Sequence, residues 1–140
     1  MSTNSSEQKN KCNDASNKLV ERLEECKNSG DSKGRAEVLF DMAHLRIAEN
    51  NQEEALLLMI EAYSLAKEFG ELSCLCPIGE LLGQLLYVAG SREEGLNIVR
   101  ESYAGFKEIG EDDKAANIEN LLDAMDAHAL ANPLPVTGAE

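Results

Sequence analysis

The sequence repeats itself with a period of 40 residues. Asn51–Gly70 (NQEEALLLMIEAYSLAKEFG) aligns with Ser91–Gly110 (SREEGLNIVRESYAGFKEIG), so that the paired glutamates, the tyrosine and the closing glycine coincide. Periods of about 20–50 residues are typical of proteins built from stacked helical or strand units. A chain of 140 residues has room for one domain of this kind.

Apolar residues recur at helical spacing in six stretches. In the first stretch, Leu19, Leu23 and Cys26 lie at i, i+4 and i+7 with charged residues between them. Most stretches end at glycine or asparagine, which favour the left-handed backbone conformation after a helix. The expected helices cover Lys11–Ser29, Ser32–Glu49, Asn51–Gly70, Leu72–Ala89, Ser91–Gly110 and Asp112–Leu130.

Two of these helices carry the same start signal. Asn51 with Glu54, and Ser91 with Glu94, have the spacing of a capping box, in which an N-cap side chain and an acidic side chain satisfy free amides. We therefore predict Asn51 and Ser91 as N-caps.

The fourth stretch is the most apolar and contains a proline. Pro77 lies in its second turn, and we expect it to delay the helix start to about Cys76 or to bend the helix. Gly79 and Gly83 are four residues apart, which indicates a notch where a neighbouring helix packs closely.

The ends of the chain lack apolar periodicity. We predict a disordered tail over 1–10, a helical repeat domain over 11–130 and a flexible tail over 131–140. The domain divides into a half repeat, two full repeats and a capping helix, over 11–30, 31–70, 71–110 and 111–130. Glu119, Asp123 and Asp126 give the capping helix a polar face toward water. Residues 134–138 (LPVTG) resemble a sortase sorting signal, but only two residues follow them, so we interpret them as part of the tail.

The paired helices resemble tetratricopeptide repeats over roughly residues 12–130. That family has a Leu-Gly or Leu-Ala-like pair in the first helix of each repeat, and small, bulky and small residues in the second. In the first helix of each repeat, the matching pairs are Met42-Ala43 and Leu82-Gly83. In the second helix, the first small position is Ala55 or Gly95, the bulky position is Met59 or Val99, and the second small position is Ala62 or Ser102. The resemblance implies an all-α, right-handed superhelix of antiparallel helix pairs with about six helices. The period is longer than the family's usual value of about 34 residues, and HEAT or armadillo arrays, with periods of about 40–47, are the alternative.

The same resemblance implies a groove that binds a peptide or helix of a partner protein. Its lining would come from the first helix of each repeat: Glu37, Phe40, His44 and Ile47; Pro77, Glu80, Gln84 and Tyr87; and Asn117, Asn120 and Ala124. Phe40 and Tyr87 would be the anchors, since aromatic side chains dominate interface energetics. The set contains two glutamates and no Lys or Arg, so we expect a neutral or basic partner. The alternative is a structural repeat protein that self-associates through its terminal helices into a homo-oligomer.

Composition argues against several other functions. A net charge of −13 disfavours nucleic acid and anionic membrane surfaces as partners. No apolar run reaches 18 residues and no export signal precedes the helices, so we expect a cytoplasmic protein with reduced cysteines. Cys74 and Cys76 alone supply too few ligands for a zinc site, and His44 and His128 have no catalytic partner in sequence. We therefore predict no metal, no cofactor and no enzymatic activity.

Overall fold

The computed structural model describes residues 3–134, and the side chains from residue 14 onward. Within that range the chain forms only α-helices and connecting turns, which confirms the all-α prediction. The helices are α1 (Thr3–Ser29), α2 (Ser32–Ala48), α3 (Gln52–Phe69), α4 (Leu72–Val88), α5 (Arg92–Glu108) and α6 (Asp112–Ala131).

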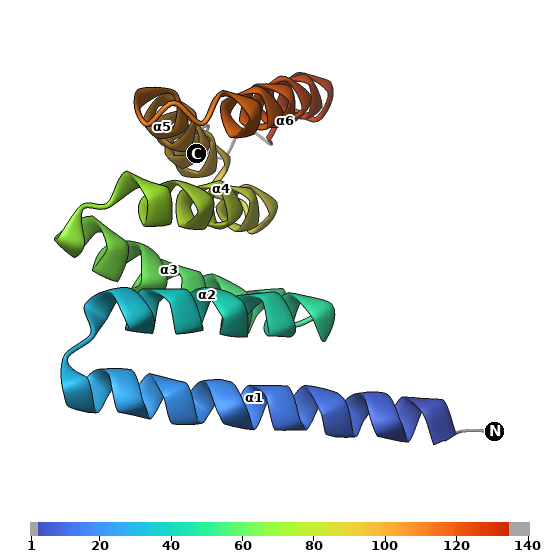
Figure 1. Ribbon diagram of the computed structural model, residues 1–140. Helices are drawn as coiled ribbons and strands as arrows, with labels where there is room; N and C mark the ends of the chain where they lie inside the picture. Colours follow the sequence, from blue (N-terminus) through green and yellow to red (C-terminus); the bar gives the residue numbers. More distant parts are fainter. Residues whose placement is uncertain (1–2, 135–140) are drawn as a thin grey trace, which may run out of the picture.

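The helices are stacked in chain order (Figure 1). Each one packs mainly against the helix before it and the helix after it. The turns between them are only two or three residues long, so successive helices run in opposite directions, as α1 to α4 show in Figure 1. This confirms packed antiparallel helix pairs.

Helix α1 is longer than the sequence pattern predicts. It begins at Thr3 and not at Lys11, so residues 3–10, expected as a disordered tail, are helical. Hydrophobic periodicity identifies only the part of a helix that packs against a neighbour. Once that part is formed, each added residue gains one backbone hydrogen bond, so a helix can extend beyond its apolar pattern.

A left-handed residue follows each of the first five helices. Gly30, Asn50, Gly70, Gly90 and Gly110 have φ values of 73°, 62°, 71°, 107° and 77° and are spaced 20 residues apart. Asn50 is the one non-glycine residue with positive φ in the described chain, and its side chain is among the few that tolerate this conformation. The turn positions predicted from sequence are confirmed.

Neither predicted capping box is complete, because the backbone amides of Asn51 and Ser91 donate to carbonyls of the preceding helix and not to a glutamate. The Asn51 side chain does cap α3: it accepts a hydrogen bond from the Glu54 amide at 3.2 Å and donates one to the Glu54 carboxylate at 2.9 Å. Ser91 lies at the N-cap of α5, as predicted, but its side chain makes no capping hydrogen bond. The two predicted N-cap positions are confirmed and the two capping boxes are wrong.

Helix α4 starts earlier than Pro77 led us to expect. It begins at Leu72, because the Glu71 carbonyl accepts hydrogen bonds from the amides of Cys74 and Leu75. Pro77 lies inside the helix, and the predicted delay to about Cys76 is wrong. Since proline has no N–H, the carbonyl of Ser73 lacks its usual donor four residues later.

The core consists of two layers of buried side chains. One lies among α2, α3 and α4, and the other among α4, α5 and α6. The small and bulky positions predicted in α3 and α5 are all buried: Ala55, Met59, Ala62, Gly95, Val99 and Ser102. Gly83 and Gly95 face each other so closely that a Cβ atom on Gly83 would lie 2.6 Å from the Gly95 carbonyl oxygen. The predicted packing notch in α4 is confirmed at Gly83.

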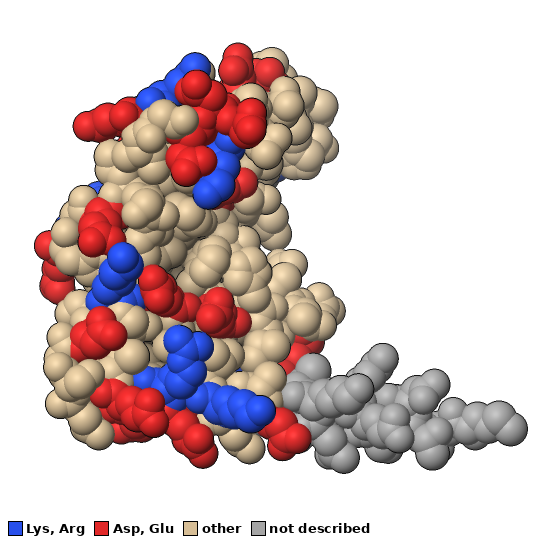
Figure 2. All heavy atoms as spheres, in the orientation of Figure 1, with Lys and Arg blue, Asp and Glu red and all other residues tan. Residues whose placement is uncertain are grey.

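The outer face of α6 is polar. Glu119, Asp123 and Asp126 are exposed, as predicted for a helix with no neighbour beyond it. Acidic side chains also occur at every level of the stack on the face drawn in Figure 2. None of the helices in residues 3–134 combines the length and apolar character that crossing a bilayer requires. Helix α6 ends at Ala131, and residues 135–140 of the predicted tail lie outside the described range.

Candidate functional site

A cavity of about 230 Å³ lies between the N-terminal halves of α2 and α4. Small-molecule sites usually measure roughly 300–1,000 Å³, so this cavity suits a single side chain better than a whole ligand. Its lining residues are Lys33, Glu37, Phe40, Ser73, Cys74, Pro77 and Ile78. We call it the α2/α4 cavity.

The inner surface of the cavity is apolar. Ile78 is buried in the core layer, and the half-buried Phe40 packs against the same layer. The Phe40 ring is also held edge-to-face by the His44 ring, with a centroid distance of 4.6 Å. Pro77 completes this surface from α4. A rigid aromatic ring on a packed floor is the arrangement that anchors an apolar side chain of a partner.

The rim of the cavity is polar. Lys33 forms an ion pair with Glu71 at 2.8 Å, which ties α2 to the start of α4. This carboxylate raises the pKa of Lys33 above its ordinary value. Glu37 and Ser73 are both exposed. The rim therefore includes a carboxylate and a serine side chain.

Cys74 lines the cavity with a protonated thiol. Burial raises its pKa, and the negative charge of Glu37 adds to that effect. Cys26, Cys74 and Cys76 are free thiols, and Cys12 lies outside the residues whose side chains are described. Burial raises the pKa of Cys76 as well.

The structure brings together part of the predicted groove. Glu37, Phe40 and Pro77 line one cavity. The exposed His44 contacts Phe40, and Ile47 is half-buried against the core. Asn117, Asn120 and Ala124 are exposed on α6 and do not line the α2/α4 cavity.

Glu80 and Gln84 lie farther along α4, toward α6. Glu80 is half-buried, and burial raises the pKa of its carboxyl while the charge of Lys114 opposes the rise. The Gln84 side chain donates a hydrogen bond to the Glu80 carbonyl at 3.2 Å. These groups form a polar continuation of the strip, with Lys114 contributed by α6.

Tyr87, predicted as an anchor, is packed inside the protein. It is only 8% exposed. Its hydroxyl lies 2.7 Å from His128 Nδ1 and 3.3 Å from the Met125 carbonyl oxygen, both on α6. The Arg92 guanidinium covers its ring at 5.3 Å from the ring centroid. With α6 covering it, Tyr87 joins two helices and presents little surface to a ligand.

Sequence reasoning missed four lining residues of the cavity. Lys33 lies one turn before Glu37, and Ser73 and Cys74 lie one turn before Pro77 and Ile78. Helical spacing places each on the predicted face, so the face was drawn one turn too short. The expectation that the groove holds no Lys or Arg is consequently wrong, although Glu71 neutralises Lys33.

No protein-family model matches this chain, and no curated protein or solved structure does either.

Proposed function

We propose that this chain is a non-catalytic binding module of the tetratricopeptide type, whose helix pairs form a superhelix around a peptide-binding groove. The α2/α4 cavity is the anchoring point of that groove, and the polar strip at Glu80 and Gln84 continues it. The partner supplies an extended or helical segment with one apolar side chain in the cavity. The role is that of an adaptor or a small chaperone-like protein.

The observation that carries the proposal is the α2/α4 cavity itself. Its volume of about 230 Å³ fits one side chain, and its floor is fixed by Phe40 and Ile78. Glu37 and Ser73, both exposed, supply polar groups at the rim beside this apolar floor. An apolar cavity of this size with a polar rim is suited to one side chain of a peptide.

The charges around the site favour a neutral or basic segment. The chain carries a net charge of −13, which attracts cationic partners at long range. Glu37 is exposed at the rim, and Glu80 lies farther along the strip. Lys33 is paired with Glu71, so it contributes little attraction for a carboxylate.

The chemistry of Cys74 supports a non-catalytic role. Nucleophilic cysteines are activated by a lowered pKa, next to a cation or a helix N-terminus. Cys74 lies in the first turn of α4 and near Lys33, whose charge lowers its pKa, but burial and the charge of Glu37 outweigh that effect and raise the pKa. The thiol is suited to act as a small apolar wall of the cavity.

Peptide selection followed by a matched pair of variants tests the proposal. A phage-displayed dodecapeptide library is selected on the full chain, and the enriched peptides are synthesised. Phe40→Ala removes the anchor ring and is expected to weaken binding by about 2 kcal/mol or more, which is roughly 30-fold in Kd. The control is Leu57→Ala on α3, because Leu57 is 68% exposed and does not line the cavity. Isothermal calorimetry gives Kd, and circular dichroism confirms that both variants remain helical.

Alkylation of Cys74 provides an independent readout. At about pH 9 the peptide is expected to slow the labelling of Cys74 by iodoacetamide and to leave Cys26, which does not line the cavity, unchanged. The proposal would be wrong if the peptides bound the Phe40→Ala variant as tightly as the wild type and did not protect Cys74. The α2/α4 cavity would then not be their binding site.

A further inference from the structure

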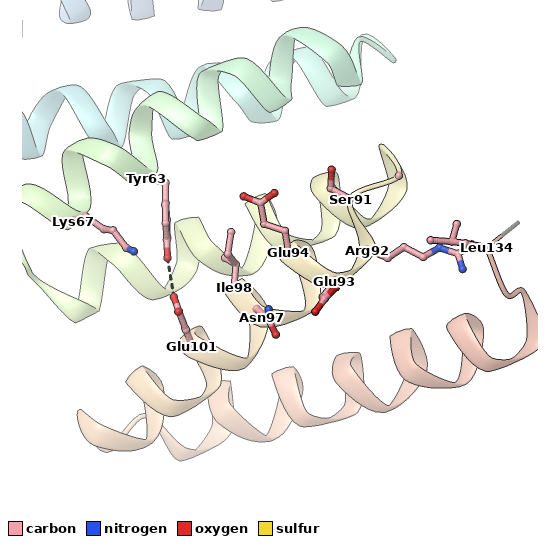
Figure 3. Close-up of a pocket in the computed structure, with 11 residues that line it drawn as sticks. Tyr63, Lys67, Ser91, Arg92, Glu93, Glu94, Asn97, Ile98, Glu101 and Leu134 are labelled. Atoms are coloured by element: carbon pink, nitrogen blue, oxygen red, sulfur yellow. Dashed lines mark hydrogen bonds between the residues drawn. The ribbon is translucent and has the colours of Figure 1, made fainter. Parts of the chain in front are cut away.

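A second and larger groove lies between α3 and α5. Its volume is about 690 Å³, three times that of the α2/α4 cavity, and the two share no lining residue. Tyr63 and Lys67 come from α3, and Leu134 closes one end (Figure 3). The other lining residues come from α5 and the turn before it: Gly90, Ser91, Arg92, Glu93, Glu94, Asn97, Ile98 and Glu101. We call it the α3/α5 groove. The residues proposed for peptide binding lie on even-numbered helices, so this groove is a separate site.

The floor of the α3/α5 groove is partly apolar. The half-buried Ile98 lies between Tyr63 at one end and Arg92 at the other (Figure 3). Leu134 is exposed at the far end. Ile60, which is 44% exposed, precedes Tyr63 by about one turn on α3 and extends the apolar surface. A bound segment can therefore bury apolar side chains here.

The charge that the groove presents is negative. The Tyr63 hydroxyl donates a hydrogen bond to the Glu101 carboxylate at 3.1 Å, which fixes Glu101 at the groove wall. Glu93 and Glu94 line the groove as well, and neither takes part in an ion pair within the described residues. Figure 3 shows the Glu94 carboxylate beside Ile98.

The two basic groups of the groove are already engaged. The Lys67 ammonium lies over the Tyr63 ring at 5.1 Å from its centroid. Arg92 lies over the Tyr87 ring and donates a hydrogen bond to the Asn132 carbonyl, which holds the segment after α6 in place. Both groups keep their positive charge, but the groove lining holds three carboxylates (Glu93, Glu94 and Glu101) against two cations, so its formal charge is −1 and it favours a cationic segment.

We propose that the α3/α5 groove is a second docking site, for a basic segment of a partner protein that carries Lys or Arg next to an apolar residue. The apolar residue packs on Ile98, and the basic groups pair with Glu94 and Glu101. The volume of the groove has room for several residues of such a segment. Because the two sites lie on different helices, the chain can bind two segments at once and link the two partner proteins that carry them.

The test uses a variant in which the first site is impaired. A phage-displayed dodecapeptide library is selected on the full-length Phe40→Ala chain, and the enriched peptides are synthesised. Binding to the wild type is compared with binding to Glu94→Gln/Glu101→Gln. Glutamine at position 101 still accepts the hydrogen bond from Tyr63, so the change removes charge and keeps the local structure. The charge-matched control is Glu119→Gln/Asp123→Asn, on the exposed face of α6.

We expect enrichment of Lys and Arg beside apolar residues. Removing two partly exposed ion pairs is expected to weaken binding roughly tenfold, and the control less than twofold. Nuclear magnetic resonance is expected to show peptide-dependent shifts of the Ile98 methyl and Tyr63 ring signals.

Three results would overturn the proposal. Selected peptides without basic residues would contradict the charge argument. Equal weakening by the α6 control would mean that net charge alone attracts the peptides. Shifts confined to the signals of Cys74 and Ile78 would place the peptides in the α2/α4 cavity. The proposal for the α2/α4 cavity fails separately, if peptides selected on the wild-type chain bind the Phe40→Ala variant equally well.

Discussion

The contact between α4 and α5 leads to a prediction that runs against helix propensity. Gly83 is in the middle of α4 and Gly95 is in the first turn of α5. Alanine is favoured over glycine inside a helix by roughly 1 kcal/mol, so Gly83→Ala would stabilise an isolated helix. We predict that it destabilises this protein.

The magnitude follows from the distance between the two backbones. A Cβ atom at Gly83 would lie 2.6 Å from the Gly95 carbonyl oxygen. Close carbon–oxygen contacts are usually no shorter than about 3.3 Å, so the helices must separate by about 0.7 Å. Overpacking of this kind costs about 1–3 kcal/mol, and here no side-chain rotation relieves it. After subtraction of the propensity gain of roughly 1 kcal/mol, we expect a net loss of about 1 kcal/mol.

Urea denaturation followed by circular dichroism measures the effect. With a slope of about 2 kcal/mol per molar urea, a loss of about 1 kcal/mol lowers the midpoint by about 0.5 M while the slope stays the same. The matched control is Gly79→Ala, one turn earlier in α4. A Cβ atom there would press on the Ser102 hydroxyl, and its other near contacts, at 3.5 Å, are ordinary.

Second-site substitutions distinguish the backbone contact at Gly83 from the side-chain contact at Gly79. Ser102→Ala is expected to remove the cost of Gly79→Ala, because it deletes the obstructing oxygen. Val99→Ala deletes a methyl group that also meets the new Cβ atom at Gly83, but it leaves the Gly95 carbonyl in place. It is therefore expected not to rescue Gly83→Ala. A Gly83→Ala variant as stable as the wild type, or a rescue by Val99→Ala, would refute the backbone-contact argument.

Three further predictions concern contacts between helices. Tyr87→Phe is expected to lower stability by about 1 kcal/mol through loss of its hydroxyl contact with His128, and to leave peptide binding unchanged, which calorimetry checks. Arg46→Ala removes hydrogen bonds to α1 and to the α2–α3 turn from a side chain that is only 14% exposed. We expect a loss of about 1–3 kcal/mol in urea and faster amide hydrogen exchange in α1. Burial and Glu101 raise the pKa of Tyr63 to about 12, so its stabilising contribution is present below pH 10 and is lost as the pH rises toward 12. Absorbance titration at 295 nm should show one late-ionising tyrosine, and Glu101→Gln should bring its ionisation to lower pH.

Local sequence signals predict most of the fold because they act within one or two turns of a helix. The apolar stripes and the left-handed turn residues placed the helices within a few residues of their positions in the structure, except at the start of α1. Ser91 shows where such a signal fails. Its residue type and spacing are those of a capping box, but the Ser91 side chain makes no capping hydrogen bond, because residue type and spacing do not fix the orientation of a hydroxyl.

The candidate site was harder to predict, because a helix alone does not say which part of its face a neighbour covers. Tyr87 lies on the predicted face of α4, yet α6, which contacts it through residues about 40 positions later, covers it. The repeat contains a hint. Ile47, the residue equivalent to Tyr87 one period earlier, is also packed against the core. The ends of α2 and α4 are therefore packing positions, and the open surface of the α2/α4 cavity belongs to their beginnings.

The same comparison limits where a partner can be anchored. The period places Glu80 at the position of Phe40, and Lys114 at the position of Cys74. The interface of α4 with α6 thus carries a carboxylate and an ammonium where the interface of α2 with α4 carries a ring and a thiol. The charge of Lys114 opposes the effect of burial on the Glu80 pKa. A peptide lying along both repeats is therefore expected to bury its apolar side chain at the first interface and to make polar contacts at the second. Glu80→Phe would restore the aromatic residue of the first repeat at the second, and we expect it to favour peptides with two apolar anchors.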